Sequence, residues 1–380
     1  MTAWEIKGWC PGALRPMQSG DGLVVRIRPP LGRLTPAQAA AIATASQSHG
    51  KGIIDLSARA NLQLRGVTEA SHPRLIDDLR AQGLIDPDIE TESLRNLIVT
   101  PFRDSETTAL AATLAATLAR MPRLPGKFGF ALDTGPRPVL TGASADIRVE
   151  RSANGRLILR PEGHPCGQSV TDLALDAVAM AEWFVANGGI TNGRGRMAAL
   201  IARGIVPPRC TLVPAEPLLA PTPGQHAEGI LVALAFGQMR AETLCQLATL
   251  NHEIRPTPWR MLFLVGATDL PAIPGLITDP ADPILRVTAC TGAPGCPQGL
   301  QDTRNLALQL APHVPVNQTF HLSGCAKGCA HPAPADLTLT ATGQGYDLIL
   351  DGTASDTPSL TSLTPGAVQD HLQALNAPHL

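Results

Sequence analysis

Strand and helix periods alternate at the start of the chain. Apolar residues occupy every second position over residues 22–28, which is the period of a half-buried strand. A T-x-x-Q capping box with proline at the first helical position begins at Thr35 and predicts a helix that ends near Gly50. Residues 53–56 and 62–67 predict two further strands, and the apolar spacing after them predicts a second helix. This order predicts a small α+β unit.

The same order of patterns returns at Gly229. Aligning the two stretches on their arginines pairs Arg59 with Arg255, and the second copy is then 11 residues shorter between its first glycine and its arginine (37 minus 26). The same alignment places Arg95 near the position of Cys290, since these residues follow the two arginines by 36 and 35 positions. Self-similarity over so long a period predicts an internally duplicated fold.

A distinct αβ segment separates the two copies. Residues 147–159 alternate around an Ala-Asn-Gly turn and predict a hairpin, and residues 172–185 have helical spacing. Residues 204–228 are rich in proline and are the best candidate for a linker. After the last cysteine, the pattern predicts another hairpin and a closing helix over residues 365–375.

Composition limits the partners of the chain. Its 380 residues suffice for two or three cores, and its formal charge of -2 gives no global attraction to nucleic acid or to an anionic membrane surface. The longest apolar run, residues 261–265, has the length of a strand and predicts no membrane span. The first residues lack a basic segment followed by an apolar one, so we expect a cytoplasmic protein.

Four cysteines stand in two glycine-rich stretches. Cys290 and Cys296 form a C-x5-C pair, Cys325 and Cys329 form a C-x3-C pair, and 28 residues separate the pairs. A cubane iron-sulfur cluster needs four thiolates around one small object and backbone amides close to the sulfurs, which glycine permits. We therefore predict that these four cysteines bind a 4Fe-4S cluster.

Zinc and disulfide bonds are the competing interpretations of these cysteines. Structural zinc sites usually begin from C-x2-4-C knuckles, whereas one spacing here is five. Disulfides need an oxidising compartment, and the N-terminus shows no secretory signal. Four other cysteines stand alone and are expected to be small buried side chains: Cys10, Cys166, Cys210 and Cys245.

The two cysteine pairs resemble the cluster signature of the sulfite and nitrite reductase superfamily, with Thr-Ala before the first pair and Ser-Gly before the second. The resemblance implies an α+β, internally duplicated fold with two ferredoxin-like half-domains and two αβ domains that bind cluster and tetrapyrrole. The half-domains would be residues 1–90 and 204–280, the second with a linker. The αβ domains would be residues 91–203 and 281–380, the second with the cluster. In haem-containing members the last cysteine, here Cys329, also bridges the cluster to the sirohaem iron.

Basic residues stand in phrases of the same superfamily. Residues 59–66 resemble an R-x-x-x-Q-x-x-G phrase, residues 95–96 begin like an R-N-V phrase, and residues 124–128 resemble an L-P-R-K-F phrase. The resemblance implies that side chains of these phrases, with two further arginines, bind the carboxylates of a tetrapyrrole: Arg59, Gln63, Arg65, Arg95, Lys127 and Arg255. A lone arginine on a strand is more often solvated, and Arg26 and Arg28 are expected to be such surface charges.

Gly129 departs from the pattern of the assimilatory reductases. Those enzymes carry a second lysine at this position, two residues after the one that matches Lys127. A dense cluster of positive charge binds and polarises a small oxyanion, so the loss of one charge weakens a site for sulfite or nitrite.

The opening residues 7–29, residues 60–66 and the cysteine pairs together most resemble the precorrin-3B synthase family, over almost the whole length. Members of this family are oxygen-dependent monooxygenases of aerobic cobalamin synthesis. The resemblance implies hydroxylation of precorrin-3A at a ring-bridge carbon, with formation of a lactone from an acetate arm. The implied partners are the tetrapyrrole precorrin-3A, dioxygen and an external electron donor, a reductase or ferredoxin with NADH as ultimate source.

The same resemblance implies two kinds of iron. A mononuclear non-haem iron would accompany the 4Fe-4S cluster and would take histidine and carboxylate ligands. The ten histidines show no spacing of a facial triad, and the three nearest the expected cavity are His164, His321 and His331. No dinucleotide-binding motif follows a predicted strand, so the chain gives no sign of binding a nicotinamide itself.

Two other functions stay open at this point. A sirohaem-dependent sulfite or nitrite reductase would use the same cysteines with sirohaem as its cofactor, and Gly129 and the short chain count against it. A carrier or sensor built on the cluster alone would need no duplicated scaffold around one cluster. The visible spectrum separates these functions, because sirohaem gives Soret-like bands and a cluster alone gives a broad shoulder.

Overall fold

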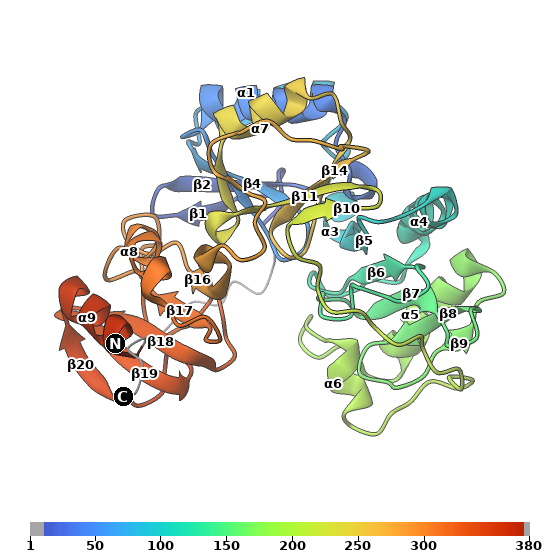
Figure 1. Cartoon of the computed structure of the whole chain (residues 1–380). Coiled ribbons are helices and arrows are strands. Elements are labelled where there is room, and N and C mark those ends of the chain that lie inside the picture. The colour runs from blue at the N-terminus through green and yellow to red at the C-terminus, as the bar shows by residue number, and fades with distance from the viewer. Residues whose placement is uncertain (1–10, 376–380) are drawn as a thin grey trace.

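The structure, a computed structural model, describes residues 11–375 and contains four five-stranded sheets within them. Figure 1 shows three lobes: a central lobe in blue and yellow, a first αβ lobe in green and a C-terminal αβ lobe in orange and red. Cys10, one of the lone cysteines, lies outside the described residues.

The central lobe holds the two copies of the duplicated unit. The first sheet has the strand order β1 (Met17–Ser19), β2 (Gly22–Ile27), β4 (Leu62–Val67), β3 (Ile53–Leu56) and β12 (Gln238–Arg240). The second has the order β10 (Gly224–His226), β11 (Gly229–Leu234), β14 (Met261–Val265) and β13 (Ile254–Pro256), and β15 (Leu276–Ile277) also pairs with β11. All these pairs are antiparallel.

Helices of both copies cover the two sheets. α1 (Pro36–His49) packs beside α7 (Ala241–Thr249) at the top of Figure 1, and α2 (His72–Ala81) packs against α1. The buried apolar side chains of both copies form one continuous core, to which α1 contributes Ile42 and α7 contributes Leu244. Within residues 11–375 no helix combines the length and the apolar character that a membrane span requires.

The two copies also exchange backbone. β12 belongs by sequence to the second copy but pairs with β3 of the first sheet, where Met239 lies opposite Ile54. In the reverse direction Leu34 of the first copy forms a bridge with Ile254 of the second, through backbone hydrogen bonds of 2.8 and 3.0 Å. Each sheet is therefore completed by a segment of the other copy.

Strand register aligns the two copies residue by residue. Ile54 lies opposite Leu64 in the β3–β4 pair, and Ile254 lies opposite Leu264 in the β13–β14 pair, which gives an offset of 200 (254 minus 54). The predicted duplication is thus confirmed in the hydrogen-bond pattern itself.

This register corrects the arginine alignment made from the sequence. With an offset of 200, Arg255 corresponds to Asp55, and Arg59 corresponds to Trp259. The pairing of Arg255 with Arg59 is wrong because the two arginines occupy different positions in the two copies: Arg255 is on strand β13, before the turn, whereas Arg59 is within the turn between β3 and β4.

The two αβ lobes repeat one arrangement of sheet and helices. In the first lobe the strand order is β5 (Leu97–Val99), β6 (Phe130–Asp133), β7 (Ile147–Arg151), β8 (Leu157–Pro161) and β9 (Gln168–Ser169). In the C-terminal lobe it is β16 (Val287–Ala289), β17 (Phe320–Ser323), β18 (Ala335–Thr342), β19 (Gly345–Gly352) and β20 (Leu360–Leu363). In each lobe the first three strands are parallel and the last three antiparallel.

Helices pack on both lobes and complete separate cores. The first lobe carries α3 (Ile89–Leu94), α4 (Ser105–Thr117), α5 (Leu173–Ala186) and α6 (Met197–Ile201). The C-terminal lobe carries α8 (Arg304–Leu310) and α9 (Pro365–Leu375).

Register also aligns the αβ lobes. Leu97 lies opposite Phe130 in the first lobe and Val287 lies opposite Phe320 in the C-terminal lobe, an offset of 190 (287 minus 97). Thr100 is therefore the counterpart of Cys290, and Arg95, expected near that position, is instead the C-cap residue of α3.

A capping-box variant tests how much α1 contributes to the central lobe. The Thr35 hydroxyl accepts a hydrogen bond from the Gln38 amide at 3.2 Å, and the Gln38 side chain accepts one from the Thr35 amide at 3.0 Å. Thr35→Ala should lower the free energy of unfolding by about 1 kcal/mol, as an unfolding midpoint in urea would show. Thr44→Ala, at an exposed position inside the same helix, should leave the midpoint unchanged or raise it slightly; equal losses in both variants would contradict the capping argument.

Candidate tetrapyrrole and cluster site

The four cysteines of the two pairs follow the ends of two neighbouring strands. Cys290 comes directly after β16 and Cys325 comes two residues after the last residue of β17. Because β16 and β17 are parallel, their carboxyl ends lie at the same edge of the sheet. The Gly324 amide donates a hydrogen bond to Cys290 Sγ at 3.1 Å, so the two loops meet at a sulfur atom.

Glycine is required where the loops meet. A Cβ atom on Gly324 would lie 3.1 Å from the Gly292 Cα and 3.3 Å from Cys290 Sγ. Gly292 and Gly328 have left-handed φ angles of 62° and 60°, which side chains disfavour. The glycines therefore let backbone approach sulfur, as the sequence predicted for a cluster site.

The thiols of the four cysteines act on one another electrostatically. Burial raises the pKa of the Cys329 thiol, Lys327 lowers it, and the negative charges of Cys325, Cys290 and Cys296 raise it further. Four thiolates in one place repel each other, so a cation such as iron stabilises the deprotonated set. Among residues 11–375 no three or more His, Cys, Asp or Glu side chains converge on a single ion.

The first copy of the central lobe holds the first cysteine loop in place. The Gly295 carbonyl accepts hydrogen bonds from Ser19 Oγ at 2.8 Å, from the Gly20 amide at 3.2 Å and from Arg65 Nη2 at 3.2 Å. Arg65 is in turn held by Asp21, at 2.7 and 3.0 Å. Arg65 was expected to bind substrate. In the structure most of its N–H groups donate to protein groups, and these bonds position the loop.

A cavity of about 250 Å³ lies between this loop and the central lobe. The cysteine loops contribute Cys290 and Cys329 to its lining, and other elements contribute polar side chains: Asp55, Gln63, Arg65, Arg260 and Arg304. Gln63 and Arg65 were expected here from the sequence, whereas Arg260 and Arg304 were not. No local pattern distinguishes these two arginines, because the turn before β14 and the start of α8 approach the cysteines only in three dimensions.

Asp55 is the carboxylate at the centre of this cavity wall. Its Oδ1 accepts hydrogen bonds from Arg304 Nη1 at 3.1 Å and from Gln238 Nε2 at 2.8 Å, and its Oδ2 lies 3.8 Å from Arg65 Nε. The Gln63 amide oxygen accepts two hydrogen bonds from Arg26, at 3.1 and 2.6 Å. Arg26, expected to be a solvated charge, is therefore tied to the wall beside the cavity.

Arg59 and Lys127 come together on the other side of the β3–β4 turn. Arg59 Nη2 donates to the Lys127 carbonyl at 2.9 Å and to Ser144 Oγ at 3.3 Å. Arg196 Nη2 reaches the same Ser144 hydroxyl at 3.2 Å. A second cavity, of about 150 Å³, is lined by Lys127, Arg194 and Arg196. Arg59 and Lys127, which were expected from the sequence, thus lie close to Arg194 and Arg196, which were not.

Arg95 and Arg255 lie outside the linings of both cavities. Arg95 Nε is 2.7 Å from Asp86 Oδ1, and its Nη2 donates to the Arg28 carbonyl at 2.9 Å. Arg255 Nε is 2.6 Å from Glu253 Oε1, and its Nη1 donates to the Pro101 carbonyl at 2.5 Å. These contacts join lobes and loops of the protein. Arg28, expected to be a surface charge, is buried and donates to the Glu92 carbonyl.

Gly129 sits where the chain has no room for a side chain. A Cβ atom there would lie 2.9 Å from the Asn96 carbonyl oxygen and 3.5 Å from Arg59 Nη1. Asn96 is itself fixed by three hydrogen bonds to backbone carbonyls, those of Ser93, Gly126 and Phe128. The missing second lysine is therefore accompanied by close backbone packing that excludes one.

The three histidines named from the sequence lie in two places. His164 is in the first αβ lobe, where its Nδ1 lies 2.8 Å from the Cys166 carbonyl. His321 is fully buried on β17, 5.6 Å from the ring of His331, and burial together with His331 lowers its pKa to about 4. In the part of the chain that the structure describes, neither ring nitrogen of His321 has a hydrogen-bond partner and no third ligand joins the pair. His321 and His331 are thus the two of these three histidines that lie together.

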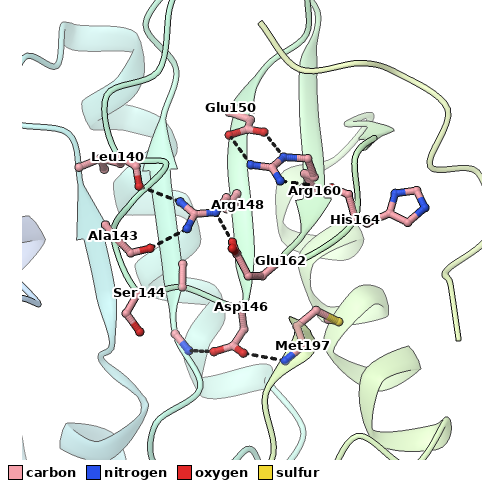
Figure 2. A network of polar contacts seen from close by, with 12 residues as sticks. Leu140, Ala143, Ser144, Asp146, Arg148, Glu150, Arg160, Glu162, His164 and Met197 are labelled. Carbon is pink, nitrogen blue, oxygen red and sulfur yellow. Dashed lines mark hydrogen bonds and ion pairs between the residues drawn. The ribbon is translucent and has the colours of Figure 1, made fainter. Parts of the chain in front are cut away.

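Strands β7 and β8 of the first αβ lobe carry ion pairs. Figure 2 shows Arg148 held by Glu162 and by the carbonyls of Leu140 and Ala143, at 2.8 and 2.6 Å for the carbonyls, and Arg160 paired with Glu150. By the offset of 190, Arg148 is the counterpart of Thr338. The first αβ lobe thus keeps the sheet but has an ion-paired arginine at the position of Thr338, which lies opposite His321 in the β17–β18 pair.

Comparison with known proteins relates this geometry to a family. Residues 15–82 match the model of the nitrite/sulfite reductase ferredoxin-like half domain. The chain is 31% identical to a precorrin-3B synthase of Sinorhizobium sp, over 93% of this chain and 84% of the relative. The chain belongs to the precorrin-3B synthase family. It therefore also belongs to the sulfite/nitrite reductase superfamily, as the cysteine signature predicted.

More distant relatives of this family member agree on the fold. A ferredoxin–nitrite reductase of Synechococcus elongatus is 24% identical, over 89% of this chain and 81% of the relative. The solved structure of the Mycobacterium tuberculosis NirA protein superposes with a TM-score of 0.60 at 16% identity and covers 92% of this chain and 79% of that one. The predicted duplicated α+β fold of the sulfite/nitrite reductases is confirmed.

Replacing the cysteines one at a time tests the cluster assignment. Cys290→Ser, Cys296→Ser, Cys325→Ser or Cys329→Ser should each abolish the bound iron and the broad visible absorbance of anaerobically purified protein, because serine does not replace thiolate sulfur. Cys245→Ser, at an exposed cysteine on α7, is the matched control and should keep both. A full cluster in the Cys329 variant would contradict the assignment.

A lysine at Gly129 tests the close packing described above. Gly129→Lys should lower the free energy of unfolding by about 1–3 kcal/mol, since its Cβ cannot be accommodated without moving the Asn96 backbone. Gly126→Lys adds the same charge three residues earlier, where a Cβ meets nothing within 4 Å, and should be close to neutral. Chemical denaturation measures both, and equal stability of the two variants would refute the packing argument.

Proposed function

We propose that the protein is an oxygen-dependent monooxygenase that hydroxylates precorrin-3A, with lactone formation, to give precorrin-3B in cobalamin biosynthesis. The observation that carries this proposal is the 31% identity to a precorrin-3B synthase over 93% of the chain. Two features of the site support it: four cysteines at one sheet edge, and basic residues on both sides of the β3–β4 turn.

The four cysteines are proposed to hold a 4Fe-4S cluster. Dioxygen has a triplet ground state and reacts slowly with a closed-shell ring, and a cluster supplies the single electrons that overcome this restriction. A separate reductase or ferredoxin, with NADH as ultimate source, would supply those electrons. Ser19, Gly20 and Arg65 act by fixing the loop that carries Cys296, since all three donate to the Gly295 carbonyl.

The basic side chains around the two cavities are proposed to bind the carboxylates of the tetrapyrrole. Lys127 lines the smaller cavity, and Arg59 donates a hydrogen bond to its carbonyl; the cavity next to Cys290, on the other side of the β3–β4 turn, has further arginines in its lining. A polycarboxylate ring is large enough to reach both groups, whereas a small oxyanion would contact one. Guanidinium groups suit this task because they pair with carboxylates through two parallel hydrogen bonds.

The reaction balances with a two-electron donor. One oxygen atom of dioxygen forms a bond to a ring-bridge carbon, and the other leaves as water after taking up two electrons and two protons. The lactone closes when a carboxyl oxygen of an acetate arm bonds to the ring carbon next to the bridge carbon, as the π bond between these two carbons breaks. The carboxyl proton passes to the new hydroxyl group, so this closure needs no further electrons. Binding of the neighbouring carboxylates by arginine keeps the ring fixed while that arm reacts.

The family resemblance also implies a mononuclear non-haem iron. Residues 11–375 bring no set of three ligands together, and His321 and His331 form only a pair. The proposed function therefore rests on the four cysteines and on the basic side chains around the two cavities.

A sirohaem-dependent sulfite or nitrite reductase is the alternative function. The 24% identity to a ferredoxin–nitrite reductase favours it, and the cysteine set suits it equally well. Against it stand the greater identity to a precorrin-3B synthase and the tight backbone packing at Gly129, which leaves no space for the second lysine of those enzymes.

Turnover of the tetrapyrrole distinguishes the two functions. Haem-free protein supplied with precorrin-3A, dioxygen and a reductant should give a pigment that has gained oxygen, detected by mass spectrometry. The gain should carry the label of labelled dioxygen and vanish under argon. An unchanged pigment, with sulfite or nitrite consumed once sirohaem is restored, would instead establish the reductase.

A further inference from the structure

Arg260 occupies a distinctive position beside the cysteines. It lies on the turn between β13 and β14 and lines two neighbouring cavities, of about 250 and 310 Å³. The first of these includes Cys290 and Cys329, and the second includes Thr288, two residues before Cys290. Its side chain therefore borders both spaces next to the proposed cluster.

The guanidinium group of Arg260 has no partner within residues 11–375. Its side chain makes neither a hydrogen bond nor an ion pair there, although its backbone amide bonds to Thr257. The other two arginines of the cavity are both paired, Arg65 with Asp21 and Arg304 with Asp55. Arg260 is thus the one of the three whose donors are all available to a ligand.

The arginines of this cavity outnumber the carboxylates that pair with them. Three arginines face two carboxylates, those of Asp21 and Asp55, so the positive charge of the half-buried Arg260 has no carboxylate partner within residues 11–375. Burial lowers the pKa of Arg260, and repulsion by Arg304 adds to the effect, with Asp55 opposing it. A buried cation is unfavourable unless it is paired, so an anion bound here would be stabilised by this residual charge.

The backbone is shaped to hold Arg260 at this place. Its φ angle is 61°, in the left-handed region that residues with side chains seldom adopt. Gly237, with φ of 69°, packs under it: a Cβ on Gly237 would lie 2.6 Å from the Arg260 Cβ. Gly237 ends a short 3-10 turn after β11, and Gly32 ends a similar turn after β2 in the first copy. A Cβ on Gly32 would meet only Arg103 Nη1, at 4.0 Å.

The duplication provides an internal reference for this position. Arg260 corresponds to Ala60, which has nearly the same φ angle of 56° on the equivalent turn. The copy that faces Cys290 therefore has an arginine at this turn position. The other copy has an alanine there, and the αβ lobe that matches the C-terminal one has Thr100 in place of Cys290. The shape of the turn does not require an arginine, so the side chain serves the site.

We propose that Arg260 binds a side-chain carboxylate of the tetrapyrrole next to the cluster, which deepens the proposed function and rests on it. A guanidinium with all its donors available matches a carboxylate bidentately, and the position between two cavities suits an arm at the edge of a ring. Arg304 and Arg65 then set the local positive potential without contributing most of their own donors.

The test compares Arg260→Ala with the wild type and with Arg156→Ala, which removes an exposed arginine from a hairpin of the first αβ lobe. Alanine suits the turn, because Ala60 has the same conformation in the first copy. Binding of uroporphyrin III, a stable octacarboxylate tetrapyrrole, is measured by fluorescence quenching, and cluster content by iron and absorbance. Arg260→Ala should bind about 10- to 100-fold more weakly with its cluster intact, and Arg156→Ala should bind normally.

Arg260→Lys separates a binding role from a purely structural one. Lysine keeps the charge but loses the planar fork, so its affinity should fall between the wild type and the alanine variant. With precorrin-3A the variants should raise KM more than they lower kcat. Equal affinity of wild type and Arg260→Ala would overturn the inference, as would loss of the cluster in both Arg260 variants. A wild-type protein that neither binds nor converts a tetrapyrrole would instead refute the proposed function.

Discussion

The hydrogen bonds that converge on the Gly295 carbonyl join the two ends of the chain. Ser19, Gly20 and Arg65 come from the first copy of the central lobe, and Gly295 stands next to a cysteine of the C-terminal lobe. The loop that carries Cys296 therefore takes its position from residues that precede it by 230 to 276 positions in the sequence. The cavity beside the cysteines exists because this junction brings β4 and the turn before β14 against the same loop.

Asp55 shows how the charges at this junction are divided. Its carboxylate is buried and shared between Arg304 and the side chain of Gln238, with Arg65 nearby. Its counterpart in the second copy is Arg255, which turns away to Glu253 and the Pro101 carbonyl. The same strand position thus carries opposite charges in the two copies. The first copy borders a cavity with several arginines beside the cysteines, whereas Arg255 of the second copy pairs with protein groups instead.

Local features of this protein could be predicted from the sequence where local physics decides them. The capping box at Thr35 and the strands at residues 53–56 and 62–67 depend on nearby side chains and are confirmed. Arg59 and Lys127 were named from family phrases and do lie together. Arg260 and Arg304 were missed because each approaches the cysteines across an interface between copies or lobes, which no periodicity records. Arg95 and Arg255 resemble ligand residues in sequence, and only their partners, Asp86 and Glu253, reveal other contacts.

The exchanged strand β12 has a consequence for how the chain is made. The first sheet contains β1 to β4 from the beginning of the chain, but its edge at β3 stays open until Gln238–Arg240 has been synthesised. An open edge presents unpaired backbone donors and acceptors to any other strand that it meets. During translation the β3 edge of the first copy therefore stays exposed while the first αβ lobe and the residues up to Gln238 are synthesised. Nascent chains stalled before residue 238 are the stage at which this enzyme is most open to pairing with the wrong partner.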